Sequence, residues 1–243
     1  MRESQAMRSF DVLLLPPAAP WPAADAVAVV DCLRATTMAV KLLDAGAQGV
    51  IAAVSESLAR QLAASTGALL AGEVEGLPPV GFDLGNSPVA VDPTMVAGRE
   101  VVLFTTNGTR ALAAARGRVV VAGAAVNAAA CARVLAQAES ALIVCAGEAG
   151  GTAFALEDLA AAACIARTLV AAHPGAIPGD GARLALELAD PPALIPAAQH
   201  ADALRRLGLH ADIDLAARVD TSEVVPVVTA RGEGWVRLEP APG

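Results

Sequence analysis

Ala26-Val-Ala-Val-Val30, followed directly by Asp31-Cys-Leu-Arg-Ala-Thr-Thr37, is the stretch that decides the fold. Its first five residues form a short run without a polar side chain, which predicts a buried β-strand. Residues 38–45 continue as a predicted helix. One carboxylate, one guanidinium group and two hydroxyls therefore lie where a strand passes into a helix. Exposed amides and the helix dipole favour anions at such a junction, and a carboxylate fits there if a metal ion accompanies the anion.

Strand-like and helix-like segments alternate along most of the chain. Because such alternation favours a mostly parallel sheet flanked by helices, we expect an α/β fold. Ligands then belong at the carboxyl ends of the strands. The predicted strands are 10–15, 26–30, 50–54, 68–71, 100–104, 119–122 and 141–145, and the predicted helices are 38–45, 55–64, 127–137, 157–169 and one from about residue 110.

Two stretches interrupt this alternation. Residues 72–93 form a long loop, and its specific polar residues favour a functional role over disorder. Residues 172–196 are rich in Gly and Pro and predict a linker or a crossing between two parts. We therefore expect an α/β core over residues 1–171 and a smaller C-terminal α+β portion over 172–243, either separate or packed into the same domain. That portion is predicted to hold a helical pair, 198–208 and 211–219, and a terminal hairpin, 224–230 with 234–238.

The composition excludes several classes of protein. A formal net charge of −8 and an aromatic content of 2% argue against nucleic acid as a partner. Every apolar run is shorter than the ~20 residues of a membrane span, and no signal peptide is recognisable, so we predict a cytoplasmic protein without a membrane partner. Met7 offers an alternative start, with residues 1–6 as a disordered lead. Lys41, the only lysine, lacks the context of a P-loop, and the four cysteines are predicted to be small buried residues.

The junction after the first buried strand carries the strongest chemical signal. Asp31 is a candidate metal ligand or nucleophile, and Arg34 is suited to grip an oxyanion in a bidentate fork. Thr36 and Thr37 are candidate hydroxyl donors to phosphate. The structural alternative is that a threonine caps the helix and that Asp31 pairs with Arg34. A phosphatase of the haloacid dehalogenase type is excluded, because Leu33 stands where that pattern needs a second Asp.

The long loop supplies a second group, Gly72-Glu73 with Gly81-Phe-Asp-Leu-Gly-Asn-Ser-Pro88. Its glycines allow the backbone to fold polar side chains back over the edge of the sheet. The candidates are Glu73, Asp83, Asn86 and Ser87. Ordinary turn formation is the alternative for this segment.

Two further junctions follow later strands. Thr105-Thr-Asn-Gly-Thr-Arg110 has the pattern of an anion-cradling turn, and Cys145-Ala-Gly-Glu-Ala-Gly-Gly151 opens a turn before Glu157 and Asp158. These two carboxylates either bind metal or complement a helix dipole. Because a parallel sheet gathers its strand ends along one edge, we expect the four groups to form one polar site. Oxygen ligands without His or Cys suit Mg²⁺.

These motifs, in this order and together with Leu156-Glu-Asp158, resemble the 2-phosphosulfolactate phosphatase family over nearly the whole chain; a weaker match covers residues 200–208 and 212–226. The family implies an α/β fold, a homodimer and a Mg²⁺-dependent phosphatase. Its reaction converts (2R)-2-phospho-3-sulfolactate to 3-sulfolactate and phosphate, a step toward coenzyme M in methanogens. Val74 departs from the pattern, since the family usually has Arg there.

Three hypotheses follow for a small anionic phosphorylated substrate. The first is the family's own reaction, the second is a phosphatase for another phosphorylated 2-hydroxy acid, and the third is a non-catalytic metal- or anion-binding module. Attack on phosphorus by water and attack by Asp31 both stay open. The predicted catalytic residues are Asp31, Arg34 and Glu73; the predicted Mg²⁺ ligands are Asp31, Glu73, Asp83, Glu157 and Asp158; the predicted substrate contacts are Thr36, Thr37, Asn86, Ser87, Asn107, Gly108, Thr109 and Arg110.

Overall fold

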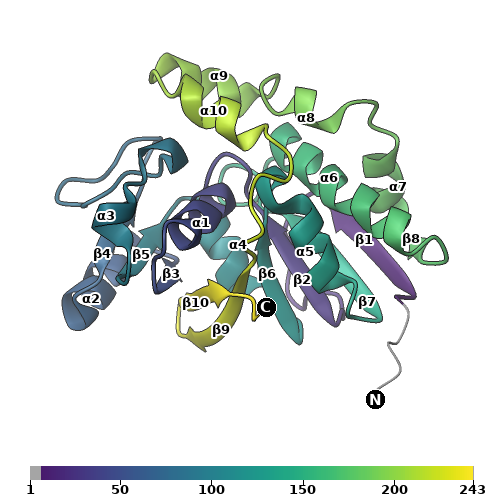
Figure 1. Ribbon diagram of the computed structural model, residues 1–243, viewed down its shortest axis with the longest axis horizontal. Coiled ribbons are helices and arrows are strands. Elements are labelled where there is room, and N and C mark those ends of the chain that lie inside the picture. Colours follow the sequence, from purple (N-terminus) through teal and green to yellow (C-terminus); the bar gives the residue numbers. More distant parts are fainter. Residues whose placement is uncertain (1–6, 243) are drawn as a thin grey trace.

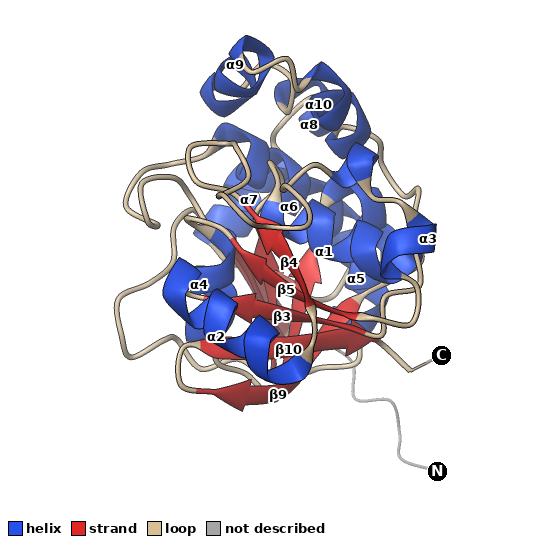
Figure 2. Ribbon diagram, turned by 90° about the vertical axis from the view of Figure 1, so that its left-hand side faces the viewer, coloured by secondary structure: helices blue, strands red, loops and turns tan. Residues whose placement is uncertain are grey.

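The computed structural model describes residues 7–242 and contains a ten-stranded mixed sheet with helices on both faces (Figures 1 and 2). The lead predicted for residues 1–6 lies outside the described residues. The strands are β1 (Ser9–Leu13), β2 (Ala26–Val30), β3 (Gly49–Ala53), β4 (Leu69–Gly72), β5 (Glu100–Phe104), β6 (Val119–Gly123), β7 (Ser140–Cys145), β8 (Ile177–Pro178), β9 (Pro226–Gly232) and β10 (Trp235–Pro240). The helices are α1 (Ala35–Asp44), α2 (Glu56–Thr66), α3 (Pro93–Val96), α4 (Gly108–Ala114), α5 (Ala128–Leu135), α6 (Leu156–Ala172), α7 (Asp180–Leu186), α8 (Pro191–Leu194), α9 (Gln199–Arg206) and α10 (His210–Ala216).

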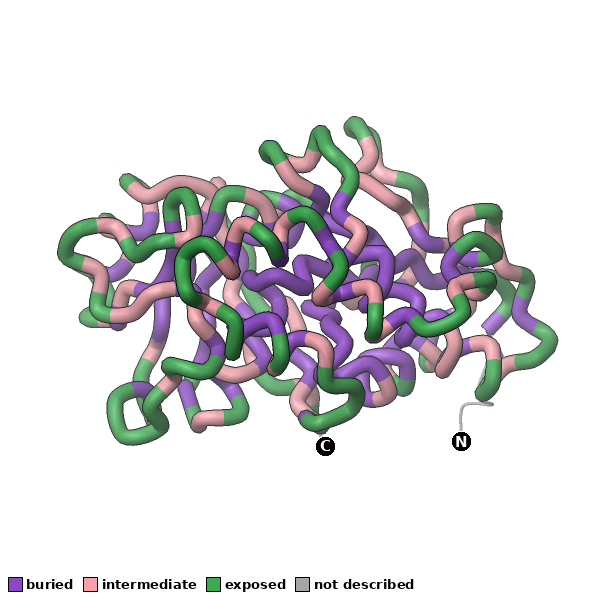
Figure 3. Tube along the Cα trace, turned by 90° about the horizontal axis from the view of Figure 1, so that it is seen from above, coloured by how far each residue is buried: buried purple, intermediate pink, exposed green. Residues whose placement is uncertain are grey.

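Strand β2 lies in the middle of the core, as its uninterrupted apolar run predicts. Its five side chains are fully buried. Val27 and Val29 pack in one cluster with α1 and α4, whereas Ala26, Ala28 and Val30 pack in another with α5 and α6. Alternate side chains point to opposite faces of a strand, so a strand covered on both faces must be apolar throughout. Buried segments fill the centre of the molecule in Figure 3, with exposed ones around them.

The C-terminal hairpin lies inside the sheet rather than beside it. The strand order is β4-β5-β3-β10-β9-β6-β2-β7-β1-β8, so β10 pairs with β3 and β9 pairs with β6, both antiparallel. Figure 1 shows this hairpin, in yellow, between the two parallel groups of strands. The terminal strands thus complete the same sheet that the first 171 residues begin.

The three antiparallel pairings in the centre correct the expectation of one common edge. Three successive antiparallel pairings separate the group β4-β5-β3 from the group β6-β2-β7-β1. The strands of the two groups therefore run in opposite directions. A flat sheet would place their carboxyl ends at opposite edges. Adjacent strands rotate by about 20–25°, so the five steps from β5 to β2 turn the strand direction by about 100–125°. This twist allows the carboxyl ends of both groups to reach one pocket.

The predicted strands and helices agree with the structure except at their ends, but residues 172–196, predicted as a linker or crossing, contain β8, α7 and α8. Strands 26–30 and 100–104 match their predicted bounds, and Ser55 caps α2 by accepting a hydrogen bond from the Leu58 amide. Helix α1 begins at Ala35, three residues before the predicted start, which changes the role of its threonines. The four cysteines are buried and free. Within residues 7–242, no helix has the length and apolar character needed to cross a membrane.

Candidate active site

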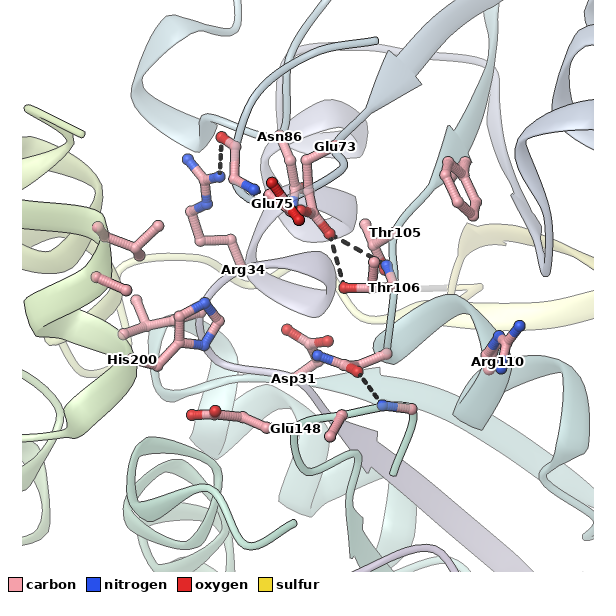
Figure 4. Close-up of a pocket in the computed structure, with 18 of the residues that line it drawn as sticks. Asp31, Arg34, Glu73, Glu75, Asn86, Thr105, Thr106, Arg110, Glu148 and His200 are labelled. Atoms are coloured by element: carbon pink, nitrogen blue, oxygen red, sulfur yellow. Dashed lines mark hydrogen bonds between the residues drawn. The ribbon is translucent and has the colours of Figure 1, made fainter. Parts of the chain in front are cut away.

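A pocket of about 870 Å³ opens where strand ends of both parallel groups meet helix α9. Its lining follows the carboxyl ends of five strands: Asp31 follows β2, Ser55 follows β3, Glu73 follows β4, Thr106 follows β5 and Glu148 follows β7. Figure 4 shows Glu73 and Thr106 on one side of the cavity, Glu148 and His200 on the other, and Asp31 between them. The remaining lining residues are Leu33, Arg34, Val54, Glu56, Glu75, Gly76, Asn86, Phe104, Thr105, Asn107, Arg110, Ala149, Gly150, Ala203, Leu204 and Leu207.

Asp31 is held in the pocket wall by the first turn of α1. Its Oδ1 accepts a hydrogen bond from the Ala35 amide at 2.9 Å. Burial raises the pKa of Asp31 to about 6; the charges of Glu73 and Glu157 also raise it, while the Ala35 amide and His200 lower it. The carboxylate therefore sits among other acids, and no Arg, Lys or His within residues 7–242 forms an ion pair with it. Asp31 and Arg34 do not form the pair considered from the sequence; Arg34 binds Asp212 instead.

We call a set of four residues the acidic group: Asp31, Glu148, Glu157 and His200. Ligand atoms of the last three lie within 4.8 Å of one another. Glu157 is buried behind the pocket wall, where its Oε1 lies 3.1 Å from His200 Nδ1 and its Oε2 has no hydrogen-bond partner among the described residues. Burial lowers the pKa of His200, but the hydrogen bond and charge of Glu157 outweigh it, and the net shift is upward.

A second set, which we call the anchored group, consists of Arg34, Glu73, Gly76, Ser87 and Asp212. Arg34 Nη1 donates to Asp212 Oδ2 at 2.7 Å, and Arg34 Nη2 donates to the Gly76 carbonyl at 3.0 Å. Glu73 Oε2 accepts from the Gly76 amide at 2.8 Å, and its Oε1 accepts from the amide and hydroxyl of Thr106, both at 3.1 Å. Every charge in the anchored group thus has a named partner.

The β5–α4 junction approaches Asp31 closely because residue 108 is glycine. A Cβ at Gly108 would lie 2.6 Å from both Asp31 Oδ2 and the Ala35 Cβ. Asn107 lines the pocket, and its Oδ1 accepts a hydrogen bond from the Gly150 amide at 2.8 Å. Arg110 also lines the pocket and is exposed to solvent. The turn therefore brings two of its four predicted contacts, Asn107 and Arg110, into the cavity.

Three predicted phosphate donors are corrected by the structure. Thr36 and Thr37 are fully buried in α1 and donate to the carbonyls of Asp31 and Cys32, each at 2.8 Å. Thr109 is likewise buried and donates to the Thr105 carbonyl at 2.9 Å. These hydroxyls stabilise the strand-to-helix junctions, as in the structural alternative, and none of them lines the pocket.

Three further predicted residues also lie outside the cavity. Asp83 is exposed, and its carboxylate accepts from the Leu70 amide on the edge strand β4. Ser87 donates to Asp212. Asp158 accepts from the amides of Cys32 and Gly147, so it ties the ends of β2 and β7 together, and burial raises its pKa well above the usual range. We therefore remove Asp83 and Asp158 from the candidate metal ligands.

Among the pocket residues that sequence reasoning missed are Glu148, His200, Thr106 and Glu75. Glu148 follows β7 just as Asp31 follows β2, so its position after a strand was a usable signal. Thr106 stood inside the quoted Thr105–Arg110 motif and Glu75 stood in the long loop over residues 72–93, but neither was selected. His200 was marked only by the weaker family match over residues 200–208, because α9 reaches the pocket from a distant part of the chain.

Comparison with known proteins shows the family to which the chain belongs. The family model for 2-phosphosulpholactate phosphatase matches residues 17–231. A protein of Deinococcus radiodurans named "Probable 2-phosphosulfolactate phosphatase" is 43% identical over 84% of this chain and 88% of its own length. A protein of Thermus thermophilus with the same name is 42% identical over 87% of this chain and 92% of its own. The chain belongs to the 2-phosphosulpholactate phosphatase family.

Proposed function

We propose that the chain is a Mg²⁺-dependent phosphatase that converts 2-phosphosulfolactate to 3-sulfolactate and phosphate. Family membership supports the reaction. The observation that carries the proposal is the acidic group itself: buried Asp31 and half-buried Glu148 line the pocket, Glu157 is buried behind its wall, and Glu157 Oε2 has no partner among residues 7–242. An acidic pocket binds a polyanionic substrate only if a cation accompanies the substrate.

The charges around the pocket support a resident cation. Five carboxylates line it, from Asp31, Glu56, Glu73, Glu75 and Glu148, against the guanidinium groups of Arg34 and Arg110. Asp31 and Glu157 are buried, and a buried charge without a partner is strongly unfavourable, so pairing with a metal ion is a common solution. Glu148 and Glu157 would hold the ion with Asp31 beside them, and these oxygen donors suit Mg²⁺. When bound, Mg²⁺ supplies neutralisation of phosphate charge and activation of water.

The chain's own donors would bind and orient the phosphate. The Arg34 guanidinium has five N–H groups, and two nitrogens already donate within the protein, so further N–H groups remain for substrate oxygens. The loose transition state of phosphoryl transfer depends mainly on such positioning and on electrostatic stabilisation. Asn86 and Asn107 add neutral groups to the same cavity, and the Asn86 Oδ1 is buried without a partner among the described residues.

Two routes for attack on phosphorus fit this arrangement. In one, water attacks; in the other, Asp31 attacks and a phosphoaspartate is then hydrolysed. A substrate whose phosphate is chiral at phosphorus separates them. Inversion of configuration in the released phosphate supports one direct displacement by water, whereas net retention supports two displacements through the phosphoaspartate.

The second candidate is a phosphatase for a phosphorylated 2-hydroxy acid without a sulfonate. Val74 favours it, because it stands where the family resemblance predicts Arg, and its neighbour Glu75 adds a negative charge to the pocket. Arg110 is then the pocket cation free to meet a second anionic group, since Arg34 is paired with Asp212.

A substrate panel tests both candidates. The kcat/KM values for 2-phosphosulfolactate, phospholactate, phosphoglycolate and phosphomalate are compared in the presence of Mg²⁺. We expect 2-phosphosulfolactate to rank first; a higher value for phospholactate would favour the second candidate. If none of them is hydrolysed, and p-nitrophenyl phosphate is not hydrolysed either, the remaining hypothesis is a non-catalytic binding module.

A further inference from the structure

Asp212 is a buried carboxylate outside the pocket that contacts two of the segments around it. It lies on α10 and is fully buried. Its Oδ2 accepts from Arg34 Nη1 at 2.7 Å, and its Oδ1 accepts from the Ser87 hydroxyl at 2.7 Å and, more weakly, from the Val89 amide at 3.4 Å. Both oxygens are therefore used, each on a different segment: the β2–α1 junction and the long loop after β4.

Burial of this ion pair is not explained by stability. The Arg34 and Asp212 side chains are 2% and 0% exposed. Desolvation of two buried charges offsets much of their attraction, and apolar residues of similar volume often stabilise a protein as well or better. A buried pair next to a pocket is better explained by the geometry that it fixes.

The fixed element is the Arg34 guanidinium. One nitrogen is bound to Asp212 and the other to the Gly76 carbonyl, whose own amide binds Glu73. Two separate anchors leave a planar guanidinium group little freedom to rotate. Helix α10 and its neighbour α9 lie above the strand ends in Figure 1. Asp212 therefore links the position of these helices to the position of Arg34 in the pocket.

We propose that Asp212 is a positioning residue for the reaction: it holds Arg34 in the orientation that meets the substrate phosphate, and it ties the long loop to the same point. This inference rests on the proposed phosphatase function. It also makes a specific prediction about charge. If Asp212 only neutralised Arg34, its removal would strengthen anion binding, whereas loss of a positioning contact weakens it.

The test compares Asp212→Asn with Asp214→Asn, the same substitution at an exposed position of the same helix. Displacement of a binding group by about 1 Å can lower activity about 100-fold, so we expect kcat/KM of Asp212→Asn to fall by about 10- to 100-fold. The inhibition constant of inorganic phosphate should rise. Asp214→Asn should match the wild type in both measurements, and circular dichroism should show both variants folded.

A double-mutant cycle with Arg34→Ala separates positioning from a general structural defect. If Asp212 acts through Arg34, its substitution causes little further loss of kcat/KM in the Arg34→Ala background. Additive losses would overturn the inference, and so would a folded Asp212→Asn variant with wild-type kcat/KM or with a lower phosphate inhibition constant.

Ser87→Ala keeps the inference testable if Asp212→Asn does not fold. This variant removes one hydrogen bond to Asp212 and leaves the ion pair intact. Loss of one hydrogen bond corresponds to roughly a 2- to 10-fold change in a rate or equilibrium constant. We therefore expect kcat/KM to fall by that factor while the melting temperature stays near the wild-type value. An unchanged kcat/KM would overturn the inference. A wild-type chain that hydrolyses none of the panel substrates would remove the proposed function and this inference with it; an active wild type beside an unaffected variant removes the inference alone.

Discussion

The acidic group and the anchored group both contribute residues to the same pocket but differ in how their charges are balanced. In the acidic group, burial and neighbouring negative charges raise the pKa of Asp31 to about 6, and Glu157 Oε2 is unpartnered among the described residues. In the anchored group, Arg34 and Asp212 are paired, and both oxygens of Glu73 accept hydrogen bonds. The difference indicates a division of roles. The acidic group has negative charge that a bound cation would balance, and the anchored group fixes the orientation of Arg34.

This comparison predicts opposite effects on stability. Removing the Asp31 charge from the acidic group removes the desolvation cost of a buried carboxylate and relieves repulsion from neighbouring acids. Removing a charge from the anchored group leaves its partner buried and unpaired. Activity should fall in both cases, so activity alone cannot distinguish the two groups, but melting temperature can.

Removal of the cation should have the largest effect. We expect EDTA to abolish phosphatase activity and Mg²⁺ to restore it, because the acidic group would otherwise repel the substrate phosphate. Phosphatase activity is measured in EDTA alone and in EDTA followed by excess Mg²⁺. Full turnover in the chelator would show that the pocket works without a divalent cation.

Asp31→Asn should nearly abolish activity and stabilise the metal-free protein. Loss of one electrostatic group at a reacting centre lowers kcat by about 100- to 1,000-fold. In EDTA at pH 8 the melting temperature should rise, since each ~1 kcal/mol of relieved repulsion adds about 2–4 °C for a chain of this size. Differential scanning calorimetry measures the shift, and a lower melting temperature would show that Asp31 is a stabilising charge.

Arg34→Ala should lower activity at least ~100-fold, the scale of losing one donor to a developing negative charge. Unlike Asp31→Asn, it should also destabilise the protein by about 3–5 kcal/mol, because it leaves Asp212 buried without its cation. Urea denaturation gives the stability change, and Arg34→Lys serves as the control that keeps the charge. If Arg34→Ala turned over at the wild-type rate, Arg34 would have no part in the reaction.

Asp83→Asn should have the smallest effect. Asp83 is exposed and outside the pocket, and such surface substitutions usually change free energies by no more than about 0.5 kcal/mol. We expect kcat/KM within about twofold of the wild type. A large loss of Mg²⁺-dependent activity would return Asp83 to the candidate metal ligands.

The sequence predicted the elements better than their arrangement. The apolar run before Asp31 predicted both a buried strand and a functional residue at its end. Thr36 and Thr37 were misassigned because α1 begins at Ala35, which turns their hydroxyls toward the carbonyls of Asp31 and Cys32. The terminal hairpin was predictable from local pattern, but its insertion between β3 and β6 was not.

The site was predictable in part for the same reason. Residues that follow strand ends, such as Asp31 and Glu73, could be placed at a pocket because strand ends gather in α/β folds. His200 and Asp212 come from α9 and α10, whose packing over the strand ends depends on contacts between segments distant in the chain. No local pattern encodes such a contact.

Mg²⁺-dependent melting tests the central claim most directly, because it does not require a known substrate. A ligand that binds only the folded state raises the melting temperature as its concentration increases. We predict that Mg²⁺ raises the melting temperature of the wild type and of Asp83→Asn but not of Glu157→Gln, which lacks the charge at the unpartnered oxygen. Equal shifts in the wild type and Glu157→Gln, or no shift in either, would contradict a cation site in the acidic group.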